Sequence, residues 1–177
     1  AQWVQNSLAG IASSALTPLA SFSIVNGVGP SGSFNFGSTT ISYVIPVNAL
    51  SPGTTVSIYG LADTSSISGV LPSDKTVVSS TVISWLSTDG TVPDASSPIA
   101  MTITNSDIVP GTVVYAITGS TLVNLGTATS NGSITTNITS DPVIVLANPY
   151  VAPVISPTPV VTPPSSGGGG GGGTGYV

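Results

Sequence analysis

The chain of 177 residues contains no cysteine, histidine, arginine or glutamate, and it has a single lysine. Without histidine there is no imidazole base and no common zinc ligand, and without cysteine there is no thiolate, disulfide or iron–sulfur ligand. Without arginine there is no bidentate clamp for phosphate. The composition therefore predicts no catalytic site, no cofactor and no metal site, and it argues against an enzyme and against a nucleic-acid-binding protein.

Charge is almost absent from this sequence. Six aspartates and one lysine give a net charge of -5, and only 4% of residues are charged, against roughly 25% in an average domain. The 29 serines and 23 threonines supply hydroxyl groups that bind water at any pH. No apolar run approaches the roughly 18 residues that a membrane-spanning helix needs, so we expect no membrane span.

The shortage of charge also suggests the medium in which the protein works. An aspartate has a pKa near 4, so in strong acid all six carboxyls would be mostly neutral and few ion pairs would be lost. We interpret the chain as a cell-surface protein exposed to a harsh, hot and acidic medium. The alternative is an ordinary threonine-rich extracellular domain.

The start of the sequence and two sequons favour export. The chain begins Ala1-Gln2-Trp3, without an initiator methionine or a basic region, as expected after removal of a signal peptide. The sequons Asn131-Gly132-Ser133 and Asn137-Ile138-Thr139 lie in a polar stretch that should be exposed. We therefore predict an extracellular, cell-surface location with N-linked glycans at Asn131 and Asn137.

Composition divides the chain into three zones. Residues 1–29 form an uncharged amino-terminal tail, residues 30–150 alternate β-rich runs with turns, and residues 151–177 form a tail rich in proline and then glycine. Prolines favour a stiff extended chain, whereas seven consecutive glycines favour no conformation. We expect the last zone to be a tether that docks on a neighbouring surface.

The middle zone is predicted to be all-β. Its runs are rich in β-branched and aromatic residues, and they cover residues 39–45, 54–59, 76–86, 99–103, 112–117, 121–123, 133–135 and 143–146. Turn signals separate them at Ser51-Pro52-Gly53, Asp89-Gly90, Val109-Pro110-Gly111, Gly119-Ser120 and Asn131-Gly132. Seven or more short strands at this spacing predict an immunoglobulin-like sandwich without helices.

The first sixteen residues fit two periodicities. One helical face would carry Leu8, Ile11, Ala12, Ala15, Leu16 and Leu19. One face of a strand would carry Val4, Leu8, Gly10, Ala12 and Leu16. Gly10, Ser13 and Ser14 have low helix propensity, and Thr17-Pro18 would end a helix, so the composition favours the strand. A second alternation, Ala20, Phe22 and Ile24, predicts the first strand of the domain proper.

Few residues are candidates for chemistry. Asp63-Thr64-Ser65 and Asp89-Gly90-Thr91 are only fragments of an aspartic-protease pattern, and we interpret them as turn residues whose carboxylates bind nearby backbone amides. Lys75 follows Asp74 and would allow an isopeptide crosslink to an asparagine if it were buried; otherwise it is an exposed turn lysine. Trp3 and Trp85 are expected to be apolar anchors.

An exported sandwich preceded by a strand-competent segment predicts polymerisation by strand donation. An extended segment of one copy adds to the sheet of the next, and because donor and acceptor are different surfaces the contact generates an open helical polymer. We assign residues 1–16 as the donor, with Val4, Leu8, Gly10, Ala12 and Leu16 on its buried face.

The sequence resembles subunits of archaeal surface filaments assembled by donor-strand complementation, most closely the thread filaments of Sulfolobus-type thermoacidophiles. The resemblance rests on the scarcity of charge, the Ala1-Gln2-Trp3-Val4-Gln5-Asn6 start, the Thr/Val-rich sandwich and the sequons at Asn131 and Asn137. It implies a glycosylated head, a tail inserted into the adjacent head, and a role in adhesion or biofilm. It assigns no role to the Pro/Gly carboxyl tail.

Three other classes share part of this pattern. A non-polymeric surface adhesin or surface-layer module would have the same composition. A type IV-like pilin would carry a long apolar amino-terminal helix, against which Gln2, Gln5, Asn6, Gly10 and Pro18 argue. A secreted acid hydrolase would need a carboxylate pair, for which Asp63 and Asp89 are the only proposal.

Overall fold

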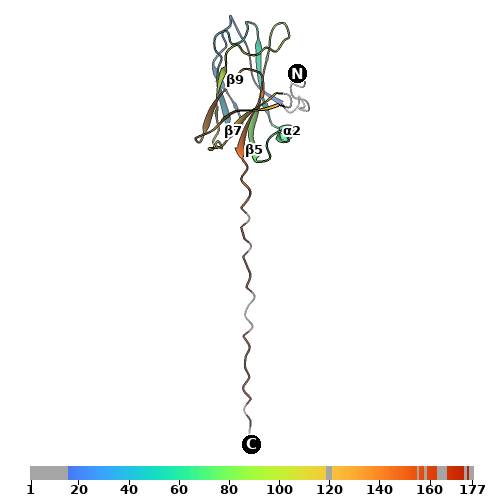
Figure 1. Ribbon diagram of the computed structural model, residues 1–177, viewed down its shortest axis with the longest axis vertical. Coiled ribbons are helices and arrows are strands. Elements are labelled where there is room, and N and C mark those ends of the chain that lie inside the picture. The colour runs from blue at the N-terminus through green and yellow to red at the C-terminus, as the bar shows by residue number, and fades with distance from the viewer. Residues whose placement is uncertain are drawn as a thin grey trace.

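The computed structural model describes residues 16–118, 121–154, 156–157, 159–162, 167–173 and 175. Within these residues ten β-strands form two antiparallel sheets, which face each other as a sandwich (Figure 1). The prediction of an all-β sandwich is therefore confirmed.

The larger sheet has six strands. In spatial order they are β1 (Leu16–Ser23), β4 (Thr55–Leu61), β5 (Lys75–Leu86), β10 (Val143–Pro149), β7 (Val113–Thr118) and β8 (Thr121–Thr127). The smaller sheet has four strands: β2 (Gly32–Phe36), β3 (Thr39–Val44), β6 (Ile99–Thr104) and β9 (Ser133–Ile138). The short helix α2 (Ser65–Ser68) connects β4 to β5.

The main core lies between the two sheets. Alternation along each strand directs one set of side chains inward, as in β9, where Ile134, Thr136 and Ile138 are buried and the intervening residues are exposed. Trp85 is the largest fully buried side chain, and both Trp85 and Met101 are 1% exposed. Period-two patterning of the sequence therefore accounts for this layer.

The larger sheet is also apolar on its second face. In β10 every residue from Val143 to Ala147 is buried, with Ile144 and Leu146 in the main core. Alternation therefore turns its other side chains away from the smaller sheet. They belong to a second cluster, composed of Leu61, Ile67, Leu71, Val82, Val113, Tyr115, Ile117, Val143, Val145 and Ala147. Ile67 comes from α2 and Leu71 from the turn after it, so this segment lies against the second face.

Each sequence-predicted run in the middle zone lies in a strand, with boundaries that differ by a few residues. The alternation at Ala20 and Phe22 lies in β1, as expected. Two elements were not predicted: β2, whose sequence Gly-Ser-Phe-Asn-Phe is poor in β-branched residues, and the helix α2. Of the predicted turns, Asn131-Gly132 connects β8 to β9 with Gly132 at φ 89°, a conformation that favours glycine; Gly119-Ser120 lies outside the described residues.

The amino-terminal donor segment lies almost wholly outside the described residues. Val4, Leu8, Gly10 and Ala12 are not described. Leu16 lies in β1 opposite Leu61 of β4 in the same chain. The assignment of Leu16 to the donor is therefore corrected, because Leu16 pairs within its own sheet. The predicted donor is reduced to residues 1–15, which we call the leader.

Candidate functional site

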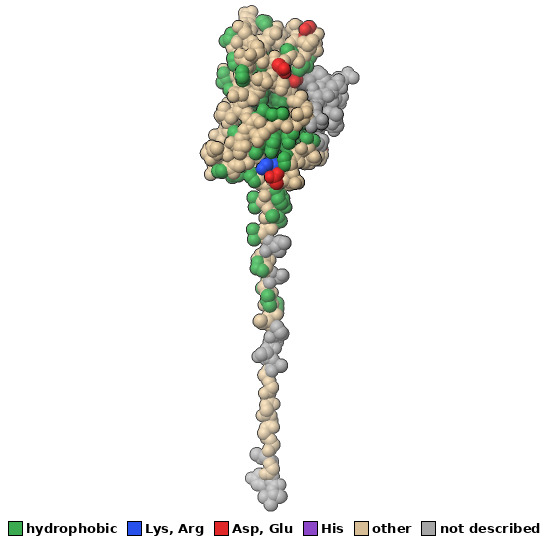
Figure 2. Space-filling view, in the orientation of Figure 1, with side chains coloured by type: hydrophobic (Ala, Val, Ile, Leu, Met, Phe, Trp, Pro, Cys, Tyr) green, Lys and Arg blue, Asp and Glu red, His purple; other side chains and the backbone are tan. Residues whose placement is uncertain are grey.

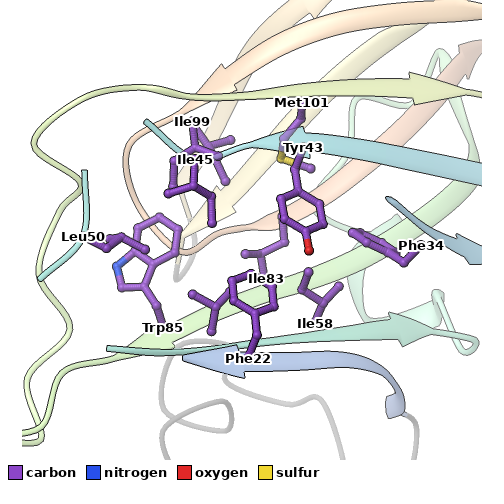
Figure 3. A pocket seen from close by; sticks show the side chains of 12 residues that line it. Phe22, Phe34, Tyr43, Ile45, Leu50, Ile58, Ile83, Trp85, Ile99 and Met101 are labelled. Atoms are coloured by element: carbon purple, nitrogen blue, oxygen red, sulfur yellow. The ribbon is translucent and has the colours of Figure 1, made fainter. Parts of the chain in front are cut away.

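A small apolar cavity of about 20 Å³ lies between the sheets (Figure 3). It is lined by Phe22, Phe34, Tyr43, Ile45, Leu50, Val56, Ile58, Ile83, Trp85, Ile99, Met101 and Ile138. The Tyr43 hydroxyl is the one polar group at the end of the cavity lined by Phe22, Phe34 and Tyr43. A water molecule there would therefore have few hydrogen-bond partners. The volume of the cavity is little more than one water molecule needs, so its lining suits the tip of an apolar side chain, such as a methyl group.

Three aromatic residues, the aromatic rim, bring this cavity to the surface. They are Phe22 of β1, Phe34 of β2 and Tyr43 of β3, and Figure 3 shows them grouped together. The rings of Phe22 and Tyr43 are stacked with centroids 5.6 Å apart, and those of Phe34 and Tyr43 are 6.2 Å apart. Phe22 and Tyr43 are only half-buried. Burial raises the pKa of the Tyr43 hydroxyl above its ordinary value, which keeps this group neutral.

Strand β2 forms one edge of the smaller sheet beside the aromatic rim. It pairs with β3 alone, through five consecutive residue pairs without a bulge. Its sequence contains no proline and no charged residue. It therefore lacks the charges, prolines and bulges that normally keep a sheet edge from pairing with another chain.

The other three edge strands are protected. In β1 the register shifts between Pro18 and Ala20, so a proline and a bulge interrupt that edge. Edges β8 and β9 lie next to each other, because the Thr136 hydroxyl of β9 donates a hydrogen bond to the Leu125 carbonyl of β8 at 3.0 Å. The edge of β2 also lies near β1, but it has neither the proline and bulge of β1 nor the hydrogen bond that joins β8 to β9. We therefore take it as the edge best suited to accept a further strand.

Both sequon asparagines are exposed. Asn131 lies in the turn before β9, and Asn137 lies on the exposed face of β9. Both positions leave room for a glycan, and glycosylation at them stays a prediction.

Lys75 begins β5 opposite Pro149 of β10. Its Nζ lies 3.6 Å from Oδ2 of Asp74, and its side chain is 15% exposed. The ammonium group thus has an ion-pair partner adjacent in sequence. The isopeptide crosslink also stays a prediction.

The two aspartate fragments are turn residues, as the sequence suggests. A carboxylate oxygen of Asp63 accepts a hydrogen bond from the Ser65 amide at 3.0 Å. Asp89 accepts hydrogen bonds from the amide and the hydroxyl of Thr91. These hydrogen bonds hold the pKa of each carboxyl below its ordinary value.

Trp85 is the apolar anchor that the sequence predicts; it is 1% exposed, and its indole N–H donates a hydrogen bond to the Pro93 carbonyl. Trp3 lies outside the described residues.

Asp141 is a titratable site that the sequence does not reveal. It lies in the connection from β9 to β10, and its Oδ2 is buried without a hydrogen-bond partner in the described part of the chain. Burial raises the pKa of this carboxyl to about 6, with a small contribution from the neighbouring charge of Asp94. Only the folded loops create this environment.

Comparisons with protein-family models, with curated proteins and with solved structures found no match. Within residues 16–175, as far as they are described, no group of three or more metal-ligating side chains occurs. No helix in the same part of the chain has the length and apolar character needed to cross a membrane. The candidate site in the described part of the chain is the surface composed of the edge of β2, the aromatic rim and the cavity behind it.

Proposed function

We propose that this chain is the structural subunit of an extracellular filament, in which each copy inserts an extended segment into the next. The observation that carries the proposal is the unprotected edge of β2 beside an apolar cavity that reaches the surface at the aromatic rim. A strand added to β2 would gain backbone hydrogen bonds, and its inward side chains would meet Phe22, Phe34 and Tyr43. Such a contact joins unlike surfaces and extends indefinitely.

The leader is the proposed donor. Val4, Leu8, Gly10 and Ala12 would share one face of an extended strand, and the glycine and serines of the leader disfavour the alternative helix. The leader carries no charged side chain that would oppose burial. It runs directly into β1, so a donated leader would remain firmly attached to its own head. In this proposal its apolar side chains pack against the aromatic rim of the neighbouring head.

The composition supports a surface location for the polymer. Exposed asparagines at both sequons support N-linked glycosylation, and the scarcity of charge supports work in acid. Together with the resemblance to archaeal thread filaments, these features favour a role in adhesion or biofilm formation.

Electron microscopy of the purified full-length chain tests the proposal. We expect helical filaments from the natural sequence, and none after Ser33→Lys with Asn35→Lys, because both residues are exposed on β2 and lysine discourages edge pairing. The matched control is Thr127→Lys with Thr135→Lys, two exposed positions on β8 and β9.

Deletion of residues 1–15 addresses the donor separately. We expect a folded head, visible by circular dichroism as a β-rich spectrum, that forms no filaments. Filaments of ordinary length from this variant would refute the leader as donor. A natural chain that stays monomeric at every concentration would instead favour the non-polymeric surface adhesin.

A further inference from the structure

The described valines of the carboxyl tail are more exposed than any large apolar residue described in the head. Val151, Val154, Val160 and Val161 are between 81% and 92% exposed, whereas the most exposed large apolar residue of the head, Val47, is 65% exposed. Figure 1 shows the described residues of the tail extending away from the end of β10, and Figure 2 shows hydrophobic side chains on the portion nearest the head. Exposed apolar side chains along an uncharged segment indicate an interaction site.

The prolines of this segment all fall on one side of an extended chain. Between residues 151 and 163 they occupy positions 153, 157, 159 and 163, which are all odd. In a β-strand the amide groups of successive residues point to opposite edges, and proline has no N–H group. The edge formed by the odd-numbered residues therefore lacks four N–H donors, whereas the edge formed by the even-numbered residues lacks none. The even edge carries amides of residues 152, 154, 156, 158, 160 and 162. Such a segment can pair with one neighbour and resists pairing with a second.

The side chains follow the same two-residue period. One face is wholly apolar, with Val151, Pro153, Ile155, Pro157, Pro159, Val161 and Pro163. The other face is mixed and carries Ser156, Thr158 and Thr162 among its members. This is the pattern of a strand with one buried face and one exposed face. A simple spacer would need neither the alternation nor the proline parity.

We propose that residues 151–162 form a one-sided β-strand that adds to the edge of β2 in a second copy of this chain. Strand β2 has no proline, bulge or charge and, unlike the edge strand β9, has no hydrogen bond from its side chains to β8 among the described residues. The aromatic rim beside it offers ring faces to the valines and prolines of the tail. In this arrangement the tail takes the edge of β2 that the proposed function assigns to the leader, so the two segments are alternative donors for one acceptor. The inference rests on the proposed function in requiring a second copy and a donated strand, and it differs in which segment is donated.

The tail is held at its base in a way that directs it outward. The amide of Tyr150 donates a hydrogen bond to the Asp74 carbonyl at 2.7 Å, which fixes the chain where it leaves β10. β10 is a central strand of the larger sheet, between β5 and β7, whereas β2 is the edge of the other sheet. Twelve extended residues can span about 40 Å, which is long enough to reach a second copy.

The test compares two adjacent substitutions, Val160→Pro and Val161→Pro, in the full-length chain. Both valines are almost fully exposed in the single chain, at 89% and 85%, so neither change should affect folding of the head. Val160→Pro removes an amide from the pairing edge, and we expect the concentration needed for filament assembly to rise about tenfold or more. Val161→Pro adds a proline to the edge that already holds the others, and we expect a change of less than about twofold.

Hydrogen exchange supplies a second measurement. Amides of Val154, Ser156 and Val160 should become protected as protein concentration rises, and Ser33→Lys with Asn35→Lys on β2 should abolish that protection. Equal behaviour of the two proline variants, or unprotected tail amides at every concentration, would overturn the proposal. Protection that is independent of concentration would also overturn it, because the tail would then bind its own head. If leader deletion abolishes filaments while neither proline variant does, the filament proposal stands and the tail proposal fails.

Discussion

The ring of Phe36 lies directly over the backbone of Gly60, so a Cβ added at that glycine would come within 2.3 Å of the ring. Phe36 belongs to β2 in the smaller sheet and Gly60 to β4 in the larger one. The contact therefore closes the sandwich just behind the edge that we propose as the acceptor. Only a residue without a side chain permits this approach.

Gly60→Ala should therefore destabilise the head. The ring of Phe36 must move, and overpacking of this kind costs typically about 1–3 kcal/mol in free energy of unfolding. Denaturant titration followed by tryptophan fluorescence measures the loss. Gly69→Ala is the matched control, because a Cβ at Gly69 meets nothing within 4 Å; an equal loss in both variants would contradict the role given to Phe36.

Trp85 should be the most sensitive position in the main core. It is 1% exposed, lines the cavity and donates its indole N–H to the Pro93 carbonyl. Trp85→Ala should lower the free energy of unfolding by about 3–5 kcal/mol, because a large buried ring is lost and a cavity remains. Val92 is 43% exposed and lies next to Pro93 in the connection from β5 to β6. Val92→Ala should change the free energy of unfolding by less than about 0.5 kcal/mol. Near-native stability of the Trp85 variant in urea titration would refute this account of the core.

The fold class could be predicted from the sequence because most strands of this chain are rich in β-branched residues and are separated by strong turn signals. β10 is the clearest case, since Val143–Leu146 is a continuous apolar run. β2 escaped prediction because its sequence has only Phe34 and Phe36 to indicate a strand, and its place depends on pairing with β3. The second apolar face of the larger sheet was missed for a related reason: both faces of a buried strand look alike in sequence.

The candidate site could be predicted only in part. The exposure of Asn131 and Asn137 followed from their polar surroundings, and the turn roles of Asp63 and Asp89 followed from local chemistry. The aromatic rim could not be foreseen, because it joins residues from three strands whose register is set by tertiary packing. The raised pKa of Asp141 likewise depends on burial by distant loops rather than on neighbouring sequence.

Glycosylation at the two sequons gives a prediction that mass spectrometry can check. In protein isolated from its natural cells, Asn131→Gln and Asn137→Gln should each remove one glycan mass, because both asparagines are exposed and their sequons are intact. Asn124→Gln is the control: Asn124 is also exposed, on β8, but is followed by Leu125-Gly126 and forms no sequon. An unmodified natural chain would contradict the prediction.

The pH dependence of stability should be unusual for an acidic protein. The pKa of Asp141 is about 6 in the folded state, above the unfolded value near 4, so the folded state binds this proton more tightly. Its contribution is therefore fully present below about pH 4 and is lost as the pH rises through about 6. Because the carboxyl is partly exposed, we discount the full shift to a loss of about 1–2 kcal/mol between pH 4 and pH 7.

Asp141→Asn isolates this effect, because asparagine keeps the shape of the side chain and cannot ionise. Urea titrations from pH 3 to pH 8 should show stability of the natural chain falling across pH 4–7, with the variant nearly level over the same range. Asp89 should affect the pH dependence of stability in the opposite direction. Hydrogen bonds from Thr91 lower the pKa of Asp89, so its contribution to stability is lost as the pH falls, and Asp89→Asn should remove that loss. A natural chain whose stability rises from pH 4 to pH 7 would show that Asp141 is solvated, and would remove the structural reason to associate this fold with acid.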